Sequence, residues 1–393
     1  MKPDFFITNR TRVCEQLGHG VLVLSAYDKM QQTNDGAAPF VQESNFWWLT
    51  GLELPGWRLL LDCDTGDAAL VAPELSDIEK AFESYYTNEV ATARSGITTI
   101  MSQAEYKEKL QAKEVYALLP DRPEDVSFCR NPALQRTWDE VQTLAATVRD
   151  ARLPLAQLRA IKQPTEVQAM QRAIDLTVET FAAITSRIGT FTNEAELAAE
   201  FTYAFMKQGA THAYDPIVAA GSNACTLHYV QNSAPLEGMI LLDIGAKLQG
   251  YNADITRTYS YREPTQRQRD VHAAVQDVLK RSIETIGPDV PVRDYLQTSD
   301  KYMREALVSL GLLKSIDDTT TFRRYFPHAM SHGLGVDVHD SLGRPEVFAP
   351  GMVLTVEPGI YIPEEGIGVR IEDDILVTRD GRTNLSAQLS TML

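Results

Sequence analysis

Four acidic residues stand where two predicted β-hairpins would bring their carboxylates together in pairs. Asp243 and Asp254 lie on the two arms of the segment LLDIGAKLQGYNADITRTY. Glu357 and Glu372 lie on the two arms of a second segment, GMVLTVEPGIYIPEEGIGVRIEDDILVT. Like charges that face each other in a sheet are destabilising unless something neutralises them. A bound cation is the simplest remedy, so these residues indicate a metal site.

The first pair of carboxylates follows from the turn of the first hairpin. Gln249 and Gly250 separate two β-rich runs, and a two-residue loop there sets Asp254 opposite Gly245. Strand side chains alternate between the two faces, so Asp243 shares the face of Gly245. Asp243 and Asp254 are therefore expected to be diagonal neighbours.

The second pair follows in the same way from a four-residue loop. With residues 363–366 as the loop, Glu357 and Glu372 face each other across the hairpin. Pro358 has no N–H to donate to the ladder, so we expect an edge or a distortion beside Glu357.

Histidines gather close to the second hairpin. Of the seven in the chain, His332 and His339 stand in the run SHGLGVDVHD, and His328 lies just upstream. A lone histidine is usually a core or surface residue. We expect this of His19, His212 and His272. The clustered histidines instead indicate a site.

These motifs make the second half of the chain resemble the metallopeptidase family with the pita-bread fold, which includes prolidase, aminopeptidase P and methionine aminopeptidase. The matching stretches, in the order of the family, are LHYVQN, LLDIGAKLQGYNADITRTY, FPHAMSHGLGVDVHD, GMVLTVEPGIYIPEEG and GVRIEDDILVT. The family binds two metal ions through five side chains. The resemblance carries these ligands onto Asp243, Asp254, His332, Glu357 and Glu372.

The resemblance also implies a role for each ligand. Asp254 and Glu372 would bridge the two ions, Asp243 would hold one of them, and His332 with Glu357 would hold the other. Glu357 would also act as general base. Four carboxylates and a neutral imidazole suit Mn²⁺ and are usable by Co²⁺ or Zn²⁺. Two such ions share a water that ionises near neutral pH, the expected nucleophile.

Four further residues would surround the substrate, according to the resemblance. His228 and His339 would stabilise the developing oxyanion, and His328 and Arg370 would line the leaving-group side. Two of them have a simpler alternative: His228 could be a packed histidine at a strand end, and Arg370 an ion-pair partner of Glu372 or its neighbour Asp373. The run 372–374 could likewise be a solvated face.

The implied substrate is a peptide with proline at its second position. Residues 40–57, FVQESNFWWLTGLELPGW, are similar to the amino-terminal domain of aminopeptidase P, so we expect an Xaa-Pro aminopeptidase. The alternative is an Xaa-Pro dipeptidase (prolidase), because prolidases carry a related first domain. Ala329 stands where the family commonly has Gly and adds a methyl group near the proposed proline pocket. Relatives without catalytic metals, such as creatine hydrolases and peptide- or histone-binding modules, have lost ligands that are intact here.

Elements of mixed α/β (α+β) type must position these residues. We expect a smaller creatinase/aminopeptidase P-like α/β domain over residues 1–155 and a pita-bread catalytic domain over 156–393. Apolar runs predict strands in the first domain near Val21–Leu24, Leu59–Leu61 and Ala69–Val71. In the second, helices are expected at 165–188, 193–208 and within 265–312, the first with a capping box from Thr165 to Gln168.

The overall composition excludes several other classes. A net charge of −16 disfavours nucleic acid and anionic lipid as partners. No apolar stretch approaches the roughly 18 residues of a membrane-spanning helix. The chain shows no signal-peptide pattern, and its four cysteines form no CxxC pair, so a cytoplasmic location is expected. The resemblance implies a homo-oligomer, a dimer or larger, and leaves open an organophosphate-hydrolysing side activity.

Overall fold

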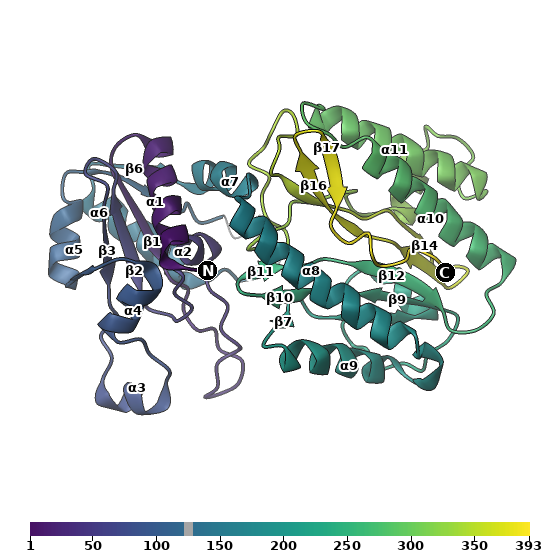
Figure 1. Ribbon diagram of the computed structural model, residues 1–393, viewed down its shortest axis with the longest axis horizontal. Coiled ribbons are helices and arrows are strands. Elements are labelled where there is room, and N and C mark those ends of the chain that lie inside the picture. The colour runs from purple at the N-terminus through teal and green to yellow at the C-terminus, as the bar shows by residue number, and fades with distance from the viewer. Residues whose placement is uncertain (122–128) are drawn as a thin grey trace. The chain divides into compact units, whose positions relative to one another are not determined.

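The computed structural model describes residues 1–121 and 129–393, which divide into two compact units, Met1–Leu158 and Arg159–Leu393. Both units mix helices and strands, as the predicted α/β class requires (Figure 1). Helix α7 (Arg152–Ala160) runs across the division, and the predicted boundary at residue 155 lies inside this helix.

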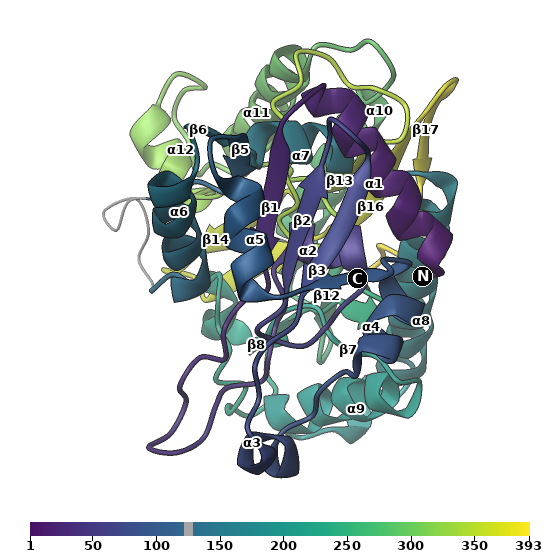
Figure 2. The ribbon, with the colours of Figure 1, turned by 90° about the vertical axis from the view of Figure 1, so that its left-hand side faces the viewer.

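The first unit is a six-stranded sheet with helices on both faces. The strand order is β4-β3-β2-β1-β5-β6, with β1 antiparallel to β2 and parallel to β5. Helices α5 and α6 lie on one face of the sheet (Figure 2). Val21 and Val23 of β1 belong to one apolar core with residues of these two helices. Helices α1, α2 and α4 contact one another, and Arg10 of α1 donates to Leu49 O of α2. The predicted strand runs all lie within β1 to β3. The elements are β1 (Val21–Ser25), β2 (Arg58–Asp62), β3 (Asp67–Val71), β4 (Thr99–Met101), β5 (Glu114–Ala117), β6 (Thr147–Asp150), α1 (Pro3–Leu17), α2 (Ser44–Thr50), α3 (Asp77–Phe82), α4 (Asn88–Ser95), α5 (Gln103–Leu110) and α6 (Pro132–Leu144).

The second unit is built around the two predicted hairpins. Helix α8 lies against the first hairpin, and the apolar sides of α10 and α11 form one core with the second. The helices are α8 (Pro164–Thr185), α9 (Glu194–Lys207), α10 (Gln266–Glu284), α11 (Val292–Ser309), α12 (Thr319–Tyr325), and the short 3₁₀ turns η2 (Ile188–Thr190) and η3 (Gly221–Cys225). The strands are β7 (Thr211–His212), β8 (Ile217–Ala220), β9 (Met239–Asp243), β10 (Ala246–Leu248), β11 (Tyr251–Asn252), β12 (Thr256–Ser260), β13 (Val353–Val356), β14 (Gly359–Ile362), β15 (Ile367–Arg370), β16 (Asp373–Thr378) and β17 (Gly381–Asn384).

The start of α8 differs from the prediction. Gln163 is the N-cap residue, Pro164 opens the helix, and Glu166 accepts from the N–H of Gln163. The predicted box from Thr165 to Gln168 is therefore wrong. Proline is favoured at the first helical position because its fixed φ suits the helix and its missing N–H has no partner to lose.

Both hairpins have the predicted register. In the first, Leu248 pairs with Tyr251 and the same register pairs Asp243 with Thr256. In the second, Gly359 pairs with Arg370, and strands β13 and β16 keep the same register, with Val356 paired to Asp373. The loop length and the alternation of side chains were sufficient to predict these pairings.

Each ladder is interrupted where its carboxylates stand. In the first hairpin the break follows Asp243, and a side chain at Gly245 would place its Cβ 1.8 Å from Ala253 O. In the second hairpin the break contains Glu357 and Pro358, as the missing donor of proline predicts. The interruptions release the like-charged side chains from direct opposition in a regular sheet.

The two hairpins join each other beside these breaks. Glu372 N donates to Thr256 O at 3.0 Å, and Thr258 Oγ1 donates to Arg370 O at 2.9 Å. Arg257 Nη1 donates to Glu372 O at 2.6 Å. Strands more than a hundred positions apart in sequence are thereby held in one local arrangement.

Arg257 also anchors the end of the chain behind this junction. Its side chain is 2% exposed and forms an ion pair with Asp373 at 2.6 Å. The same guanidinium donates to Leu389 O and Ser390 O, both at 3.0 Å. The last residues therefore close over a buried ion pair adjacent to Glu372.

We expect Arg257→Met to lower the free energy of unfolding by about 3 to 5 kcal/mol, because it leaves the Asp373 carboxylate buried without its partner. Urea unfolding followed by circular dichroism measures the change. Arg269→Met is the matched control, since Arg269 pairs with Glu263 at the surface and should matter by less than about 1 kcal/mol. Equal effects of the two substitutions would contradict this role of Arg257.

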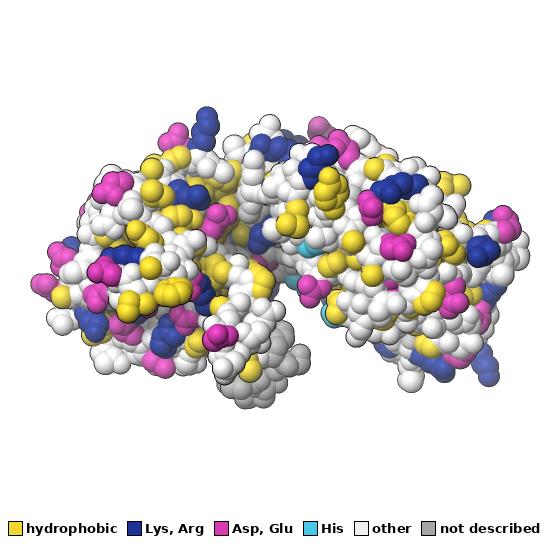
Figure 3. Space-filling model, turned by 90° about the horizontal axis from the view of Figure 1, so that it is seen from below, with side chains coloured by type: hydrophobic (Ala, Val, Ile, Leu, Met, Phe, Trp, Pro, Cys, Tyr) yellow, Lys and Arg dark blue, Asp and Glu magenta, His cyan; other side chains and the backbone are white. Residues whose placement is uncertain are grey.

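The described helices include none that is long and apolar enough to cross a membrane. On the face drawn in Figure 3, basic and acidic side chains are interspersed.

Candidate metal centre

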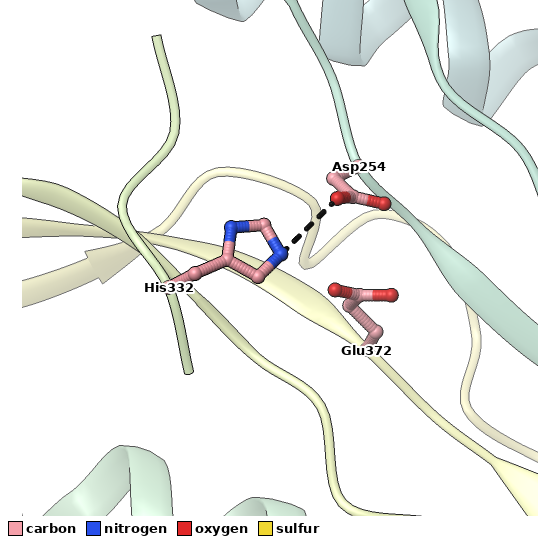
Figure 4. A group of neighbouring side chains, drawn as sticks. All are labelled: Asp254, His332 and Glu372. Carbon is pink, nitrogen blue, oxygen red and sulfur yellow. Dashed lines mark ion pairs between the residues drawn. The ribbon is translucent and has the colours of Figure 1, made fainter. Parts of the chain in front are cut away.

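Three of the five predicted ligands converge in the second unit. Single ligand atoms of Asp254, His332 and Glu372 all lie within 4.8 Å of one another. Figure 4 shows the three side chains pointing toward a common point from three separate segments. His332 Nε2 is 3.4 Å from Asp254 Oδ2. This spacing suits a shared divalent cation.

The other two predicted ligands lie beside this group. Glu357 Oε1 is 3.5 Å from His332 Nε2, and Glu357 Oε2 is 3.4 Å from His328 Nδ1. Asp243 is linked to Asp254 through the phenol of Tyr214, which donates to one oxygen of each carboxylate at 2.6 Å. Asp243 and Glu357 thus lie next to the group of three, one beside Asp254 and the other beside His332.

Tyr214 is a site residue that sequence reasoning missed. Burial, followed by the charges of Asp243 and Asp254, raises the pKa of the phenol well above its ordinary value, so its proton stays in place to be donated. The signal in the sequence was only its place upstream of LHYVQN, where several side chains are equally polar. Thr256 was missed as well, and its hydroxyl donates to Glu372 Oε2 at 2.7 Å.

Arg370 is buried in the site, where its positive charge is paired with the carboxylate of Asp243. It also donates to the hydroxyl of Tyr361 at 2.8 Å. The alternative partners considered from sequence, Glu372 and Asp373, are not the ones it pairs with in the described ion pairs. Residues 372–374 are buried, so the interpretation of this run as a solvated face is wrong.

Excess negative charge is the main electrostatic feature of the centre. Burial raises the pKa of Glu357 to about 7, although His332 and Arg370 act in the opposite direction. Burial and repulsion from Asp254 and Glu357 raise the pKa of Glu372 well above its ordinary value. Burial raises the pKa of Asp243 too, in spite of Arg370. The carboxylates therefore lack sufficient cationic partners among the surrounding side chains.

The histidines respond to the same charges in different ways. Burial alone would lower the pKa of His332, but Asp254 and Glu357 outweigh it and raise the pKa to about 9. Burial lowers the pKa of His328 to about 3. Burial and neighbouring His332 lower the pKa of His339. His332 is thus the ring most strongly attracted to the carboxylates.

A cavity of about 700 Å³ opens onto this group of side chains. It is lined by all nine predicted site residues: His228, Asp243, Asp254, His328, His332, His339, Glu357, Arg370 and Glu372. Its remaining walls include the apolar side chains of Ile217, Leu227 and Val338, together with Ala329. A pocket with an apolar wall and a polar floor suits a small peptide end.

His228 and His339 occupy the exposed side of the cavity. Both are exposed to solvent, and the ring of His339 lies 4.2 Å from that of His332, centroid to centroid. His328 is placed differently, because its Nε2 is 2.9 Å from the hydroxyl of Tyr361. Of the histidines set aside from sequence, His272 is buried and His212 Nε2 contacts Thr202 Oγ1 at 2.8 Å.

The residues present fit a divalent metal centre. The donor set is four carboxylates and one imidazole, the oxygen-rich kind that Mn²⁺ and similar ions prefer. Burial raises the pKa values of Glu357 and Glu372, and the charges of neighbouring carboxylates act in the same direction. Bound cations would remove that repulsion and keep the carboxylates ionised.

We expect Tyr214→Phe to weaken metal binding by about 10- to 100-fold, because both bridged carboxylates lose the donor that orients them. Calorimetric titration of the metal-free protein with Mn²⁺ measures the change. Tyr261→Phe is the matched control, since the Tyr261 hydroxyl donates at 2.8 Å to Phe191 O, outside the centre. Unchanged affinity in Tyr214→Phe would contradict the orienting role.

Comparison with known proteins finds two family models. Residues 168–379 match the model of metallopeptidase family M24, and residues 6–116 match the amino-terminal domain of aminopeptidase P. The chain is 33% identical to the Xaa-Pro aminopeptidase of Haemophilus influenzae, over 97% of this chain and 94% of that protein. It is 31% identical to the Xaa-Pro aminopeptidase of Escherichia coli, over 98% and 94% respectively.

Solved structures give the same result. Aminopeptidase P from Escherichia coli matches with a TM-score of 0.87 at 27% identity, covering 100% of this chain and 96% of that one. The zinc-substituted form of that enzyme in complex with product matches with a TM-score of 0.85 at the same coverage.

Proposed function

The chain belongs to metallopeptidase family M24, and we propose that it is an Xaa-Pro aminopeptidase, which releases the first residue of a peptide whose second residue is proline. The observation that carries the proposal is the convergence of Asp254, His332 and Glu372 in a cavity that Asp243, Glu357 and two exposed histidines also line. Full-length similarity to Xaa-Pro aminopeptidases supports the choice of reaction.

Five side chains would hold the metal ions in this proposal: Asp243, Asp254, His332, Glu357 and Glu372. Two bound divalent ions, for which Mn²⁺ is favoured over Co²⁺ or Zn²⁺, would polarise the scissile carbonyl and lower the pKa of a bound water. Asp254 and Glu372 offer ligand atoms within 4.8 Å of each other and of His332, which supports carboxylates that bridge.

The remaining residues act on the substrate. Glu357 accepts the proton of the attacking water as general base. His228 and His339 donate hydrogen bonds to the carbonyl oxygen as negative charge develops on it. His328 and Arg370 line the cavity and would contact the departing proline, and Arg370 also holds Asp243 and Tyr361.

A bond before proline is a tertiary amide and offers no N–H to a protease. A site that acts on the carbonyl through metal ions and hydrogen-bond donors does not need that N–H. The apolar wall formed by Leu227, Val338 and Ala329 gives room for an apolar ring or side chain. The substrate is therefore proposed to be a peptide with a free amino terminus and proline in second place.

Two peptides separate this proposal from the dipeptidase alternative. The Mn²⁺-loaded protein is incubated with an Xaa-Pro dipeptide and with a longer Xaa-Pro-Xaa peptide, and the released residue is quantified. Efficient release from the longer peptide supports the aminopeptidase. Cleavage of the dipeptide alone would indicate prolidase, and no cleavage of either would overturn the peptidase function.

Metal content, assembly and location complete the proposal. Elemental analysis should find about two divalent ions per chain. We expect a homodimer or larger assembly, which light scattering after size exclusion measures. The four cysteines are free thiols, as is usual in a cytoplasmic protein.

A further inference from the structure

The loop that carries His339 is tied to the body of the second unit at both ends. Gly333 forms a bridge with Asp340, so residues 333–340 close on themselves. On the outgoing side, His332 O accepts from Thr355 N at 2.9 Å, and Leu334 N donates to Val353 O at 3.0 Å. The metal-ligand candidate His332 is thus held directly by strand β13.

The C-terminal end of the loop is held through the side chain of Asp340. Its side chain is 3% exposed, and its Oδ1 accepts from Arg159 Nη2 at 2.8 Å. Its Oδ2 lies 3.6 Å from Lys162 Nζ, whose side chain is 1% exposed. A carboxylate fixed by two buried cations has little freedom to move, and its neighbour in the chain is His339.

Asp340 leaves no room for a side chain at either glycine of the motif SHGLGVDVHD. A Cβ on Gly335 would lie 2.2 Å from Asp340 Oδ2, and a Cβ on Gly333 would lie 2.3 Å from Asp340 O. Asn252 closes the remaining side by donating from its side chain to Gly335 O at 3.0 Å and to Val336 O at 2.7 Å. The loop is shaped to receive the side chain of Asp340.

We propose that Asp340, clamped by Arg159 and Lys162, is a positioning residue that holds His339 at the cavity. This inference rests on the proposed function, in which His339 contacts the scissile carbonyl. His339 itself is exposed, and its chain neighbour Asp340 is buried and paired with Arg159 and Lys162. The orientation of an exposed hydrogen-bond donor is set by the group that holds its backbone.

Asp340→Asn tests the proposal, because it preserves the shape of the side chain and removes the charge that the two cations clamp. We expect kcat toward an Xaa-Pro-Xaa peptide to fall by about 10- to 100-fold with little change in KM and no loss of metal. Asp337→Asn is the matched control. It is the neighbouring carboxylate on the same loop and also pairs with Arg159, but its side chain is 51% exposed.

A double-mutant cycle separates positioning from general damage. In a His339→Ala background, Asp340→Asn should change kcat by no more than about twofold, since the group it positions is already gone. An equal loss of kcat in both backgrounds would show that Asp340 acts only on stability, and an unchanged kcat in the single variant would also overturn the proposal. Lys162→Met, which keeps the Arg159–Asp340 pair, provides a second and milder variant if Asp340→Asn folds poorly.

Hydrogen exchange provides a readout that does not depend on activity. Amides in residues 333–340 should exchange faster in Asp340→Asn than in the wild-type protein, while those of β13 keep their rates. Unchanged exchange in the loop would overturn the clamp. If the wild-type protein cleaves no proline peptide, the proposed function fails and the exchange data alone decide on the clamp.

Discussion

Glu357→Gln is expected to abolish nearly all peptidase turnover and to leave the fold intact. Glutamine has the same size as glutamate, but its amide cannot accept a proton from the attacking water. The carboxylate of Glu357 lies 3.5 Å from Nε2 of His332 and 3.4 Å from Nδ1 of His328, and it lines the cavity. Loss of a general base costs about 10²- to 10⁴-fold in rate. The value of kcat at saturating Mn²⁺ and peptide measures the loss.

The control for Glu357→Gln lies in the loop of the same hairpin. Glu364 is exposed and pairs with Arg324, so Glu364→Gln should retain normal kcat. Circular dichroism should show the same spectrum for both variants and the wild-type protein. Near-normal turnover by Glu357→Gln would refute the assignment of Glu357 as base.

Removal of the metal ions is the second change with a large expected effect. We expect a chelator to abolish activity and Mn²⁺ to restore it. We also expect the metal-free protein to unfold at a lower temperature, because the buried carboxylates then repel one another without a cation between them. Scanning calorimetry with and without the chelator measures the difference in the midpoint of unfolding, which reflects the free energy of metal binding.

This difference should widen as the pH rises from about 5 to about 9. In the metal-free protein the pKa of Glu357 is raised from 4.5 to about 7. Protonation of Glu357 therefore stabilises the folded metal-free protein fully below about pH 4.5, and this stabilisation is lost as the pH rises through about 7. The pKa of His332 is raised from 6.5 to about 9, with the same sign. Metal ions must displace both protons, and this becomes easier with increasing pH.

Groups remote from the centre do not disturb this comparison. We expect buried His272, whose pKa burial lowers to about 4, to titrate alike in the metal-bound and metal-free proteins, so that its contribution cancels in the difference between their unfolding temperatures. A difference that stays constant or shrinks between about pH 5 and about pH 9 would contradict the assignment of Glu357 and His332 as ligands.

Local sequence pattern was sufficient for the parts of the fold that are set by neighbouring residues. The loops at Gln249–Gly250 and at 363–366 predict the pairings of both hairpins, because the period of a strand leaves one register that buries the apolar face. Pro358 likewise predicts the break beside Glu357. The helix start at Pro164 was misjudged because Gln163, an unusual capping residue, carries the cap in place of Thr165.

Partners that are far apart in the chain could not be predicted. Tyr214 joins Asp243 to Asp254, and Arg370 pairs with Asp243 rather than with the acids beside it in sequence. Lys162 and Asp340 meet across 178 positions, and neither residue type shows a pattern that would connect them. Such contacts arise when complete elements pack together, so no local rule anticipates them.

The sequence by itself determined the two carboxylate pairs, since turn length and strand alternation place Asp243 near Asp254 and Glu357 near Glu372 within each hairpin. Only the tertiary structure decided that the two pairs share one centre, because the hairpins must join through Thr256 and Glu372. It also decided which histidine joins them. The backbone of His332 is tied to strand β13, which brings its ring to Asp254, while His328 turns to Tyr361 and His339 remains at the cavity.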